Sequence, residues 1–348
     1  MCKIYKYCAI FCGLAMVSCI GVDFAYTDNE PEGFGTSKIN IVMNWQPDIQ
    51  ETSIPEDMTV LMSRNSREIH YMWKVGNDGM LPGDIPVEPV VRFGEYHAAA
   101  FNVPEDILTI EGLDKFSGTA SYPMSSVTAS LPIISASELK NNFGVTPDEL
   151  GYEYSVVGQA ARLWHAYSEI SVDKNEYTPL LEFAPADLSV DFIFNLQFRV
   201  SGGVGISSVI AALTGVPSSV CLMDGTVSQN SLHKVAFRMD ETENTGNTIK
   251  FTGRARTLGV SYDDYGSFLA GPGIVWIAVD VYSGTTKKRL YTGINIMNRL
   301  KAAGIMTSAG NGYKVAKNSA NIDLGTFSIN ADKLASGDDA IVEWINRK

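Results

Sequence analysis

The residue whose chemistry is clearest from its surroundings is Cys19. Lys3 and Lys6 precede a short apolar run, and the small residue Ser18 stands directly before the cysteine. A basic start, a short apolar run and a small residue at the cleavage point together form an export signal. With a cysteine first after the cut, the pattern predicts a bacterial lipoprotein that loses residues 1–18 and carries acyl chains such as palmitate on the Cys19 thiol.

Two other interpretations of this N-terminal run are weaker. A membrane-spanning helix needs about 20 apolar residues, and this run is shorter. Cleavage further on, near Ala25, would instead release a soluble secreted protein. Four of the five cysteines lie at or before Cys19, which favours lipidation. Each acyl CH₂ buried in a bilayer contributes about 0.8 kcal/mol, so we expect a firm lipid anchor at the outer membrane, facing the cell surface.

The charge of the chain favours the same mode of attachment. The 348 residues carry a formal charge of -12, and removal of residues 1–18 takes away two lysines and no acid. A surplus of negative charge argues against nucleic-acid binding, which depends on neutralising phosphates with Lys and Arg. It also argues against adhesion to anionic lipid. The acyl chains would therefore have to hold the protein at the membrane.

Other side chains that could do chemistry lack the spacing that it requires. None of the four histidines has a spacing that places two imidazoles on one metal ion: His70, His97, His165 and His233. Residues 202–205 are rich in glycine, but no Gly-Lys-Ser/Thr follows, so we expect a turn rather than a phosphate loop. The acidic residues at 224, 240–243 and 263–264 lack the EF-hand pattern and are expected in solvated loops. No Gly-x-Ser-x-Gly elbow occurs. We expect no enzyme, no catalytic residue, no metal and no cofactor.

Cysteine and tryptophan residues in the mature chain are expected to be structural. Cys221 stands between Val220 and Leu222, which predicts a buried small hydrophobe rather than a nucleophile. With only Cys19 beside it after signal removal, an intrachain disulfide framework is excluded. All five tryptophans have apolar neighbours, which favours core packing over sugar stacking: Trp45, Trp73, Trp164, Trp276 and Trp344.

The first part of the chain predicts a tether and then short strands. Residues 19–37 hold four acids and no Lys or Arg, so we expect a flexible stalk. Residues 38–45 alternate apolar and polar side chains, which predicts a strand. Further strands are expected near 58–63, 68–73, 88–93, 96–102, 126–131, 168–172 and 180–183. A short helix over 137–142 is expected to be capped by Ser135 or Ser137. Short strands with Gly, Pro and Asp turns favour a β-sandwich over residues 38–186.

A second sandwich is expected over residues 187–348, after a break at 184–187. Residues 189–200 show the clearest alternation in the chain and predict a long strand. More strands are expected at 206–214, 219–223, 232–239, 248–258, 274–282, 287–293 and 322–329. Residues 294–303 show helical spacing. Residues 338–344 alternate and predict a last strand, which the sequence leaves open as retained or donated to a neighbour.

Several phrases carry a resemblance to a known family. INIVMNW, PEDMTVLM and GEYHAAAFN in the first half, and LTGVPSSVCLMDG, HKVAFRM, KKRLYTGINI and IDLGTF in the second, resemble the FimB-type fimbrillin family of Bacteroidales lipoproteins. The resemblance covers almost the whole mature chain and includes no catalytic signature. It implies two tandem, antiparallel, transthyretin-like β-sandwiches and a role in anchoring, starting or decorating surface fimbriae. It further implies that polymerising relatives lose their first strand to a trypsin-like protease.

The distribution of basic residues bears on that processing step. The stalk before Lys38 has no Lys or Arg, and neither has the stretch 46–62, so the next basic residue is Arg64. Cutting at Lys38 would leave the opening strand in place, and cutting at Arg64 would require attack on an expected strand. We therefore predict a fimbrial anchor or assembly subunit that keeps its lipid and first strand. It would pair with fimbrillin subunits by β-strand complementation.

Two other classes of function stay open at this point. One is a surface binding module, either a fimbrial tip adhesin or a glycan-binding lipoprotein. Its mark would be an exposed aromatic platform. The other is a hydrolase with an unrecognised site, which would require a nucleophile within hydrogen-bond reach of a base.

Overall fold

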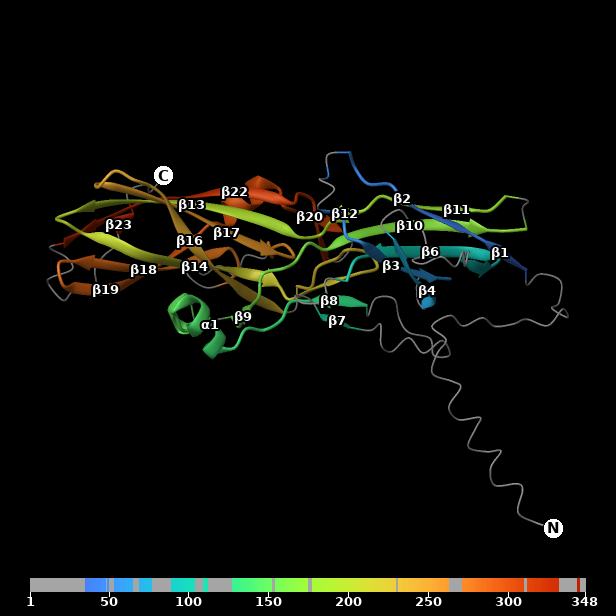
Figure 1. The fold of residues 1–348 in the computed structure, drawn as a ribbon, viewed down its shortest axis with the longest axis horizontal. Helices are drawn as coiled ribbons and strands as arrows, with labels where there is room; N and C mark the ends of the chain where they lie inside the picture. The colour runs from blue at the N-terminus through green and yellow to red at the C-terminus, as the bar shows by residue number, and fades with distance from the viewer. Residues whose placement is uncertain are drawn as a thin grey trace, which may run out of the picture.

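The chain folds into β-sheets with two short α-helices in its described part (Figure 1). The structure is a computed structural model. It describes residues 35–47, 49, 53–64, 69–76, 89–103, 109–111, 127–151, 154–174, 177–229, 231–262, 271–309, 312–331 and 343–344. The predicted signal, Cys19 and most of the predicted tether lie outside these residues. No helix in the described ranges is long and apolar enough to cross a membrane. The predicted all-β sandwich class is confirmed.

One end of the elongated molecule is built on a five-stranded sheet in the order β12-β10-β6-β3-β4. Its strands are β3 (Asp57–Ser63), β4 (Ile69–Gly76), β6 (Gly94–Phe101), β10 (Trp164–Val172) and β12 (Ala186–Asp187). Four shorter strands pack against one face of this sheet: β1 (Thr36–Lys38), β2 (Asn40–Met43), β5 (Val90–Arg92) and β11 (Leu180–Phe183). Apolar side chains from both layers form one core, as the alternation in their sequences requires.

The opening strand lies in the middle of its layer and is divided in two. β1 pairs antiparallel with β5, and β2 pairs in parallel with β11. The change of partner occurs at Ile39, whose N–H donates to Pro89 O, while the N–H of Asn40 donates to Pro179 O, both at 2.9 Å. The sequence predicts one strand from residue 38, whereas pairing begins at Thr36. The last two residues of the predicted stalk are therefore already part of the fold.

The other end of the molecule holds a nine-stranded sheet. Its path is β19-β18-β14-β16-β17-β13-β22-β23, with β9 beside β16. The strands are β9 (Val156–Val157), β13 (Val190–Ser201), β14 (Gly205–Pro217), β16 (Leu232–Asn244), β17 (Thr248–Thr257), β18 (Ile274–Ser283), β19 (Thr286–Asn295), β22 (Ser319–Asn330) and β23 (Glu343–Trp344). Of the predicted last strand, residues 338–342 lie outside the described part.

A change of partner along β16 folds this sheet into two layers. Its first half pairs with β14 and its second half with β17. The alternating side chains of β13 fill the space between the layers, as the sequence predicts, and Phe194 stacks on Phe237 with ring centroids 5.0 Å apart. Most strand pairs are antiparallel. The pairs β13–β22, β2–β11 and β9–β16 are parallel.

The nine-stranded sheet is the main packing partner of residues 127–151 and 154–163. It contains β8 (Thr128–Ser130), α1 (Ala136–Phe143), the short 3₁₀ helix η3 (Asp148–Leu150) and β9. β8 joins β7 (Thr109–Glu111) to β15 (Ser219–Cys221), so a small sheet links the two halves of the chain. α1 confirms the predicted helix, and Ser135 is its N-cap, in a reciprocal capping box with Glu138. The remaining elements are α2 (Met297–Ala303), β20 (Met306–Ala309) and β21 (Gly312–Val315).

Lys234 fixes the η3 turn to the sheet from an interior position. Only 1% of the residue is exposed, and its ammonium donates hydrogen bonds to Pro147 O at 2.8 Å and to Gly151 O. Burial lowers the pKa of Lys234 to about 8, and the charge of nearby Asp148 acts in the opposite direction. A buried ammonium that meets only carbonyl oxygens is less stable than one in water.

A pH dependence follows from this buried lysine. Between about pH 8 and the ordinary pKa of 10.5, the unfolded chain keeps the proton on Lys234 and the folded chain has lost it. The free energy of unfolding should therefore rise with pH across this window. Urea titrations at pH 8, 9 and 10 would measure the slope, and the Lys234→Met variant should lack this contribution. Parallel curves for the two proteins would contradict the assignment.

Candidate functional site

The predicted lipidation residue, Cys19, lies outside the described part of the chain, so its modification stays a prediction. The nearest described residues lie in the opening segment, β1 and β2. Ile39, Ile41 and Met43 are buried there, with 1%, 7% and 6% of each residue exposed. A segment that lies between β5 and β11 and covers the core cannot leave without exposing apolar side chains and both neighbouring strand edges.

Both basic residues considered as protease sites lie in or beside paired strands. Lys38 is exposed, but its backbone pairs with Val90 in the β1–β5 ladder. Arg64 directly follows β3, and its guanidinium donates to Phe93 O at 2.8 Å. A cut after Lys38 would leave β2 in place, and a cut after Arg64 would detach β1, β2 and β3 together. Lys38 thus precedes Ile39, Ile41 and Met43 in the chain, so cleavage after Lys38 would not remove these buried side chains.

The outer edge of β22 is the second feature relevant to assembly. β22 pairs with β13 along its length, from Ser319 to Asn330. On its other side, among the described residues, it pairs only with β23, at Phe327 and Ser328. The guanidinium of Arg299 from α2 reaches the carbonyl of Asp323 on the same strand. An incompletely paired edge of this kind can accept an extended segment.

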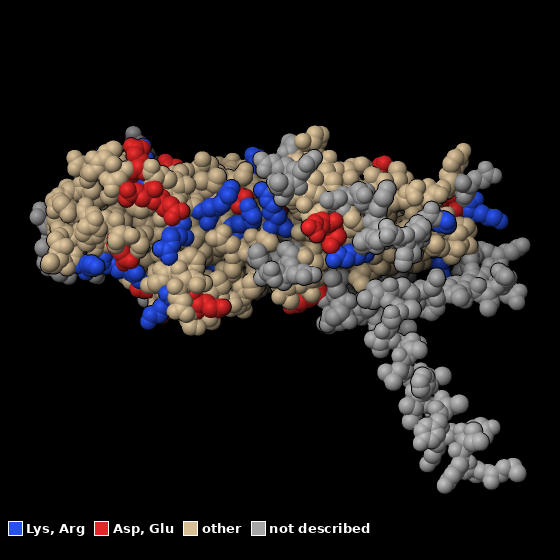
Figure 2. Space-filling model, viewed as in Figure 1, with Lys and Arg blue, Asp and Glu red and all other residues tan. Residues whose placement is uncertain are grey.

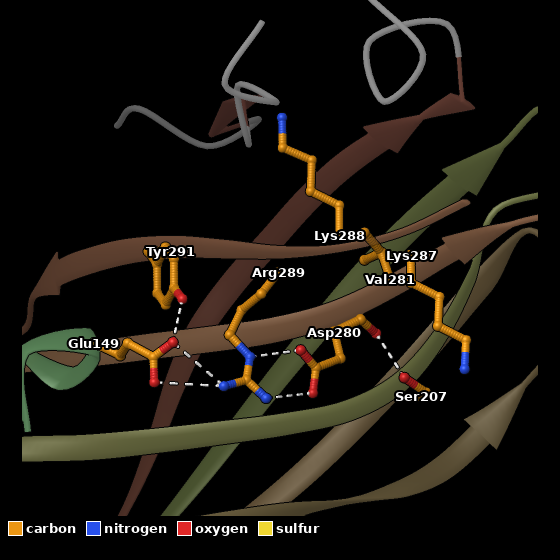
Figure 3. Close-up of a pocket in the computed structure, with 8 residues that line it drawn as sticks. All are labelled: Glu149, Ser207, Asp280, Val281, Lys287, Lys288, Arg289 and Tyr291. Carbon is orange, nitrogen blue, oxygen red and sulfur yellow. Dashed lines mark hydrogen bonds and ion pairs between the residues drawn. The ribbon is translucent and has the colours of Figure 1, made fainter. Parts of the chain in front are cut away.

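A charged pocket of about 460 Å³ lies on the outer face of the sheet formed by β14, β18 and β19, next to η3. The residues that line it are Glu149, Ser207, Asp280, Val281, Lys287, Lys288, Arg289 and Tyr291. Figure 3 shows that Arg289 lies between two carboxylates, with Asp280 on one side and Glu149 on the other. Strand β19 is an end of the sheet's path, so the pocket stands beside a sheet edge.

Arg289 is the centre of a hydrogen-bond network in this pocket. Its Nε and Nη2 donate to Asp280 Oδ1 and Oδ2 at 2.6 and 2.8 Å, which is a bidentate pair. Its Nη1 donates to Gly144 O at 2.8 Å and contacts both Glu149 oxygens at 3.4 Å. The bonds from Arg289 keep the pKa of Asp280 below its usual range, and the bonds to Asp280 raise the pKa of Arg289. Both groups therefore stay charged.

Glu149 is held by partners on two elements. Tyr291 Oη donates to Glu149 Oε1 at 2.5 Å, and the N–H of Thr146 donates to Oε2 at 2.6 Å. Burial acts to raise the pKa of Glu149, but these bonds and Arg289 outweigh it and lower the pKa. Burial, together with the bond to Glu149, raises the pKa of Tyr291 to about 12. The phenol of Tyr291 is therefore a donor at neutral pH.

A β-bulge shapes the floor of the pocket. The register between β14 and β18 shifts between Ile206 and Ser208, so that two serines meet Asp280. Ser208 Oγ donates to Asp280 Oδ2 at 2.6 Å, and Ser207 Oγ donates to Asp280 O at 3.2 Å. Bulges redirect side chains and occur often beside functional sites. Sequence reasoning missed this pocket, and the available signal was Asp280 within an otherwise apolar strand.

The histidines do not come together, as far as their side chains are described. His97 contacts the hydroxyl of Tyr167 and lies 3.2 Å from Glu169 Oε1 on an exposed sheet face. His165 is buried, and His233 bonds to Ser231 at 3.2 Å. The described part of the chain holds no group of three or more His, Cys, Asp or Glu side chains suited to a metal. The side chain of His70 is not described.

The other sequence candidates have structural positions. Gly202 and Gly203 form the predicted turn, with φ of 70° and 74°. Thr226 donates to Asp224 from both its N–H and its hydroxyl, at 2.9 and 2.6 Å, as in a local turn. The expectation of a loop at 240–243 is wrong, because these residues lie in β16, whose exposed end extends past β14. Residues 263–264 lie outside the described part.

The described aromatic residues and Cys221 also serve packing. Trp45 packs edge-on against buried Trp164 at 5.3 Å between ring centroids, and Trp73 stacks on Tyr71 at 5.4 Å. Trp276 is half-buried, and the side chain of Trp344 is not described. Cys221 is a half-buried free thiol, and burial raises its pKa, which disfavours the reactive thiolate.

Charges of both signs are mixed over the face seen in Figure 2, where basic groups gather near the middle of the long axis and wide areas carry neither sign. Between β17 and β13, Arg256 Nε donates to Asp191 Oδ1 at 2.8 Å, and Arg254 lies 3.6 Å from the same carboxylate. These two arginines are therefore paired within the molecule.

Comparison with solved structures shows the fold. The chain matches a candidate adhesin from Bacteroides ovatus with a TM-score of 0.50 and 12% identity, over 83% of this chain and 93% of that one. A looser match, with a TM-score of 0.45 and 11% identity, is to the fimbrial anchor protein Mfa2 from Porphyromonas gingivalis, over 88% and 94% of the two chains. At 12% identity, the match to the candidate adhesin shows a likeness of fold alone. No protein-family model matches the sequence, and no curated protein matches it significantly.

Proposed function

We propose that this chain is a non-enzymatic lipoprotein of the cell surface that anchors or helps assemble a fimbria. In this role it keeps both its N-terminal lipid and its opening strand. The observation that carries the proposal is the placement of that strand between β5 and β11. Its buried apolar side chains follow Lys38, the first basic residue after Cys19. The Cys19 motif and the fimbrillin-like phrases of the sequence support it, as does a fold shared with a candidate adhesin.

The partners in this role are fimbrillin subunits. A fimbrial subunit joins its neighbour when an extended segment of one chain completes a sheet of the other. In this chain the incompletely paired edge of β22 is the candidate acceptor. Since the opening strand stays in place between β5 and β11, its own position in the N-terminal sandwich is not open to a strand from a neighbour. The chain would thus end a fimbria at the membrane rather than lie within its length.

The Cys19→Ala variant tests this role in cells. Without the acyl chains the acidic surface has no other hold on the membrane, so the variant should move almost entirely from the membrane fraction to the medium. Fimbriae should be shed with it. Immunoblotting of fractions and electron microscopy of cells measure both effects, and Cys221→Ala is a matched control that should stay membrane-bound.

The N-terminus of the native protein provides the decisive second measurement. Mass spectrometry of protein taken from cells should find an acylated Cys19 followed by an intact residue 38 and opening strand. A native N-terminus at residue 65 or later would show that the opening strand had been removed. That result would contradict an anchor that keeps its first strand.

A further inference from the structure

The pocket beside β19 is fixed in shape before any ligand arrives. Arg289 uses its donors on Asp280, Gly144 and Glu149, and each carboxylate is also held by a hydroxyl group. Because these polar groups already have partners, a ligand need not reorganise them, and preorganised sites lose less free energy on binding. Arg289 therefore acts as a strut that positions both carboxylates.

The groups left for a ligand are of three kinds. A carboxylate offers about four acceptor sites, and Asp280 uses three of them, on Arg289 and Ser208. The Lys287 ammonium has no described partner and points to the Ser207 side of the pocket, whereas Lys288 extends away from the network (Figure 3). The pocket thus combines an open acceptor with one available cation.

Exposed tyrosine rings supply the third kind of group. Tyr291, 46% exposed, is a wall of the pocket. Tyr282, 43% exposed, stands opposite Lys287 on β18, and its ring occupies the space that a Cβ at Gly205 would take. Along the strands, the two rings therefore lie on opposite sides of the Asp280–Arg289 pair, with Lys287 level with Tyr282. Tyrosine rings offer an apolar face beside a polar tip, a combination that suits the face of a sugar ring.

We propose that this pocket binds a saccharide that carries a carboxylate, such as a sialic or uronic acid unit. The sugar hydroxyls would donate to Asp280, its carboxylate would meet Lys287, and an apolar sugar face would lie on Tyr291. A small dianion such as phosphate fits poorly because its second charge has no cation to meet beyond Lys287, and it has no apolar face to lie on Tyr291. A neutral sugar would gain no charge pairing with the exposed Lys287 ammonium. The proposal does not depend on the anchoring role, since the pocket is distant from β22's outer edge along the sheet's path.

Binding of a matched pair of sugars to the purified full-length chain tests the proposal. The two sugars are 3′-sialyllactose and lactose, which differ by one sialic acid unit, and their binding is measured by isothermal titration calorimetry. A tetrasaccharide that contains glucuronic acid tests uronic acids in the same way. We expect at least one acidic probe to bind ten-fold or more tightly than lactose. Lys287→Met should weaken that binding at least ten-fold, and Tyr291→Ala should weaken it at least three-fold.

The control variant is Lys174→Met, which removes an exposed lysine in the loop after β10. It should bind the acidic probe within two-fold of the parent, and the unfolding midpoints of Lys174→Met and Lys287→Met should match the parent. Equal affinity for acidic and neutral sugars, absence of binding by either acidic probe, or full affinity in Lys287→Met would each overturn the proposal. None of these results would bear on lipid attachment or on the fate of the opening strand.

Discussion

Replacing Ile41 by aspartate should lower the free energy of unfolding of the N-terminal core by more than about 3 kcal/mol. Ile41 is 7% exposed and packs in one core with side chains of the five-stranded sheet. The substitution removes buried methyl groups and leaves an unpaired carboxylate among apolar side chains. Urea denaturation of the purified chain, followed by tryptophan fluorescence, measures the loss, since Trp45, Trp73 and Trp164 pack in or beside this core.

Asn40 provides a matched control for this substitution. It precedes Ile41 in the same strand but is exposed, because successive side chains of a strand point to opposite faces. Asn40→Asp introduces the same charge and should change the free energy of unfolding by less than about 0.5 kcal/mol. Equal stability of the two variants would mean that the opening strand is not part of the core and can leave it without a large loss of stability.

The long strands were predictable because their side chains alternate over many residues. β13 shows this best, since every second residue from Val190 to Val200 is buried. The division of the opening strand at Ile39 was not predictable, because it reflects a change of hydrogen-bonding partner from β5 to β11. Alternation in a sequence specifies which face is buried and carries no information on which strand lies beside it.

Short elements escaped prediction for a related reason. β9 and β12 have two residues each, too few for any period to show, and they form only because neighbouring strands offer partners. The burial of Lys234 also could not be predicted from the sequence. Lys234 lies in β16. From its residue type alone, a lysine is expected to be exposed to solvent. Residues 147–151 cover it instead, and two of their carbonyl groups accept its hydrogen bonds.

Of the two candidate functional features, one could be predicted from the sequence and the other could not. Cys19 could be proposed from sequence because its motif is local, and nothing in the fold is needed to recognise it. The pocket could not, because Glu149 and Arg289 are far apart in the chain and meet only when η3 packs beside β19. The bidentate pair of Arg289 with Asp280 depends on strand register as well.

Acidification should weaken the junction between the two halves of the chain through His165. This residue pairs with Ala186 at the β10–β12 ladder, is 8% exposed, and has no described partner for its Nε2 atom. Burial lowers the pKa of His165 to about 4, partly offset by hydrogen bonds with the backbone of Leu222 and Met223. Lys314 acts to lower the pKa further, and Asp224 acts to raise it.

The direction of the effect follows from proton binding. Between pH 6.5 and about 4 the unfolded chain takes up a proton at His165 and the folded chain does not. The free energy of unfolding must therefore fall as pH falls through this window, by about 3 kcal/mol at its lower end. Urea titrations at several values from pH 7 to pH 4 measure the fall. The His165→Gln variant keeps a polar side chain that does not titrate, so the difference between the two curves isolates this histidine.

The location of the loss distinguishes His165 from the acidic residues that also titrate in this range. His165 lies in β10 of the five-stranded sheet. Its ring bonds to the backbone of Leu222 and Met223, which directly follow β15 in the second half of the chain. Protonation should therefore loosen this contact before either core. At pH 4.5 the protection of backbone amides against hydrogen exchange, relative to their intrinsic rates, should fall first at residues 162–166 and 221–225. It should fall later in β13. An equal loss of protection in β13 and at the junction, or the same pattern in His165→Gln, would assign the acid sensitivity to other groups.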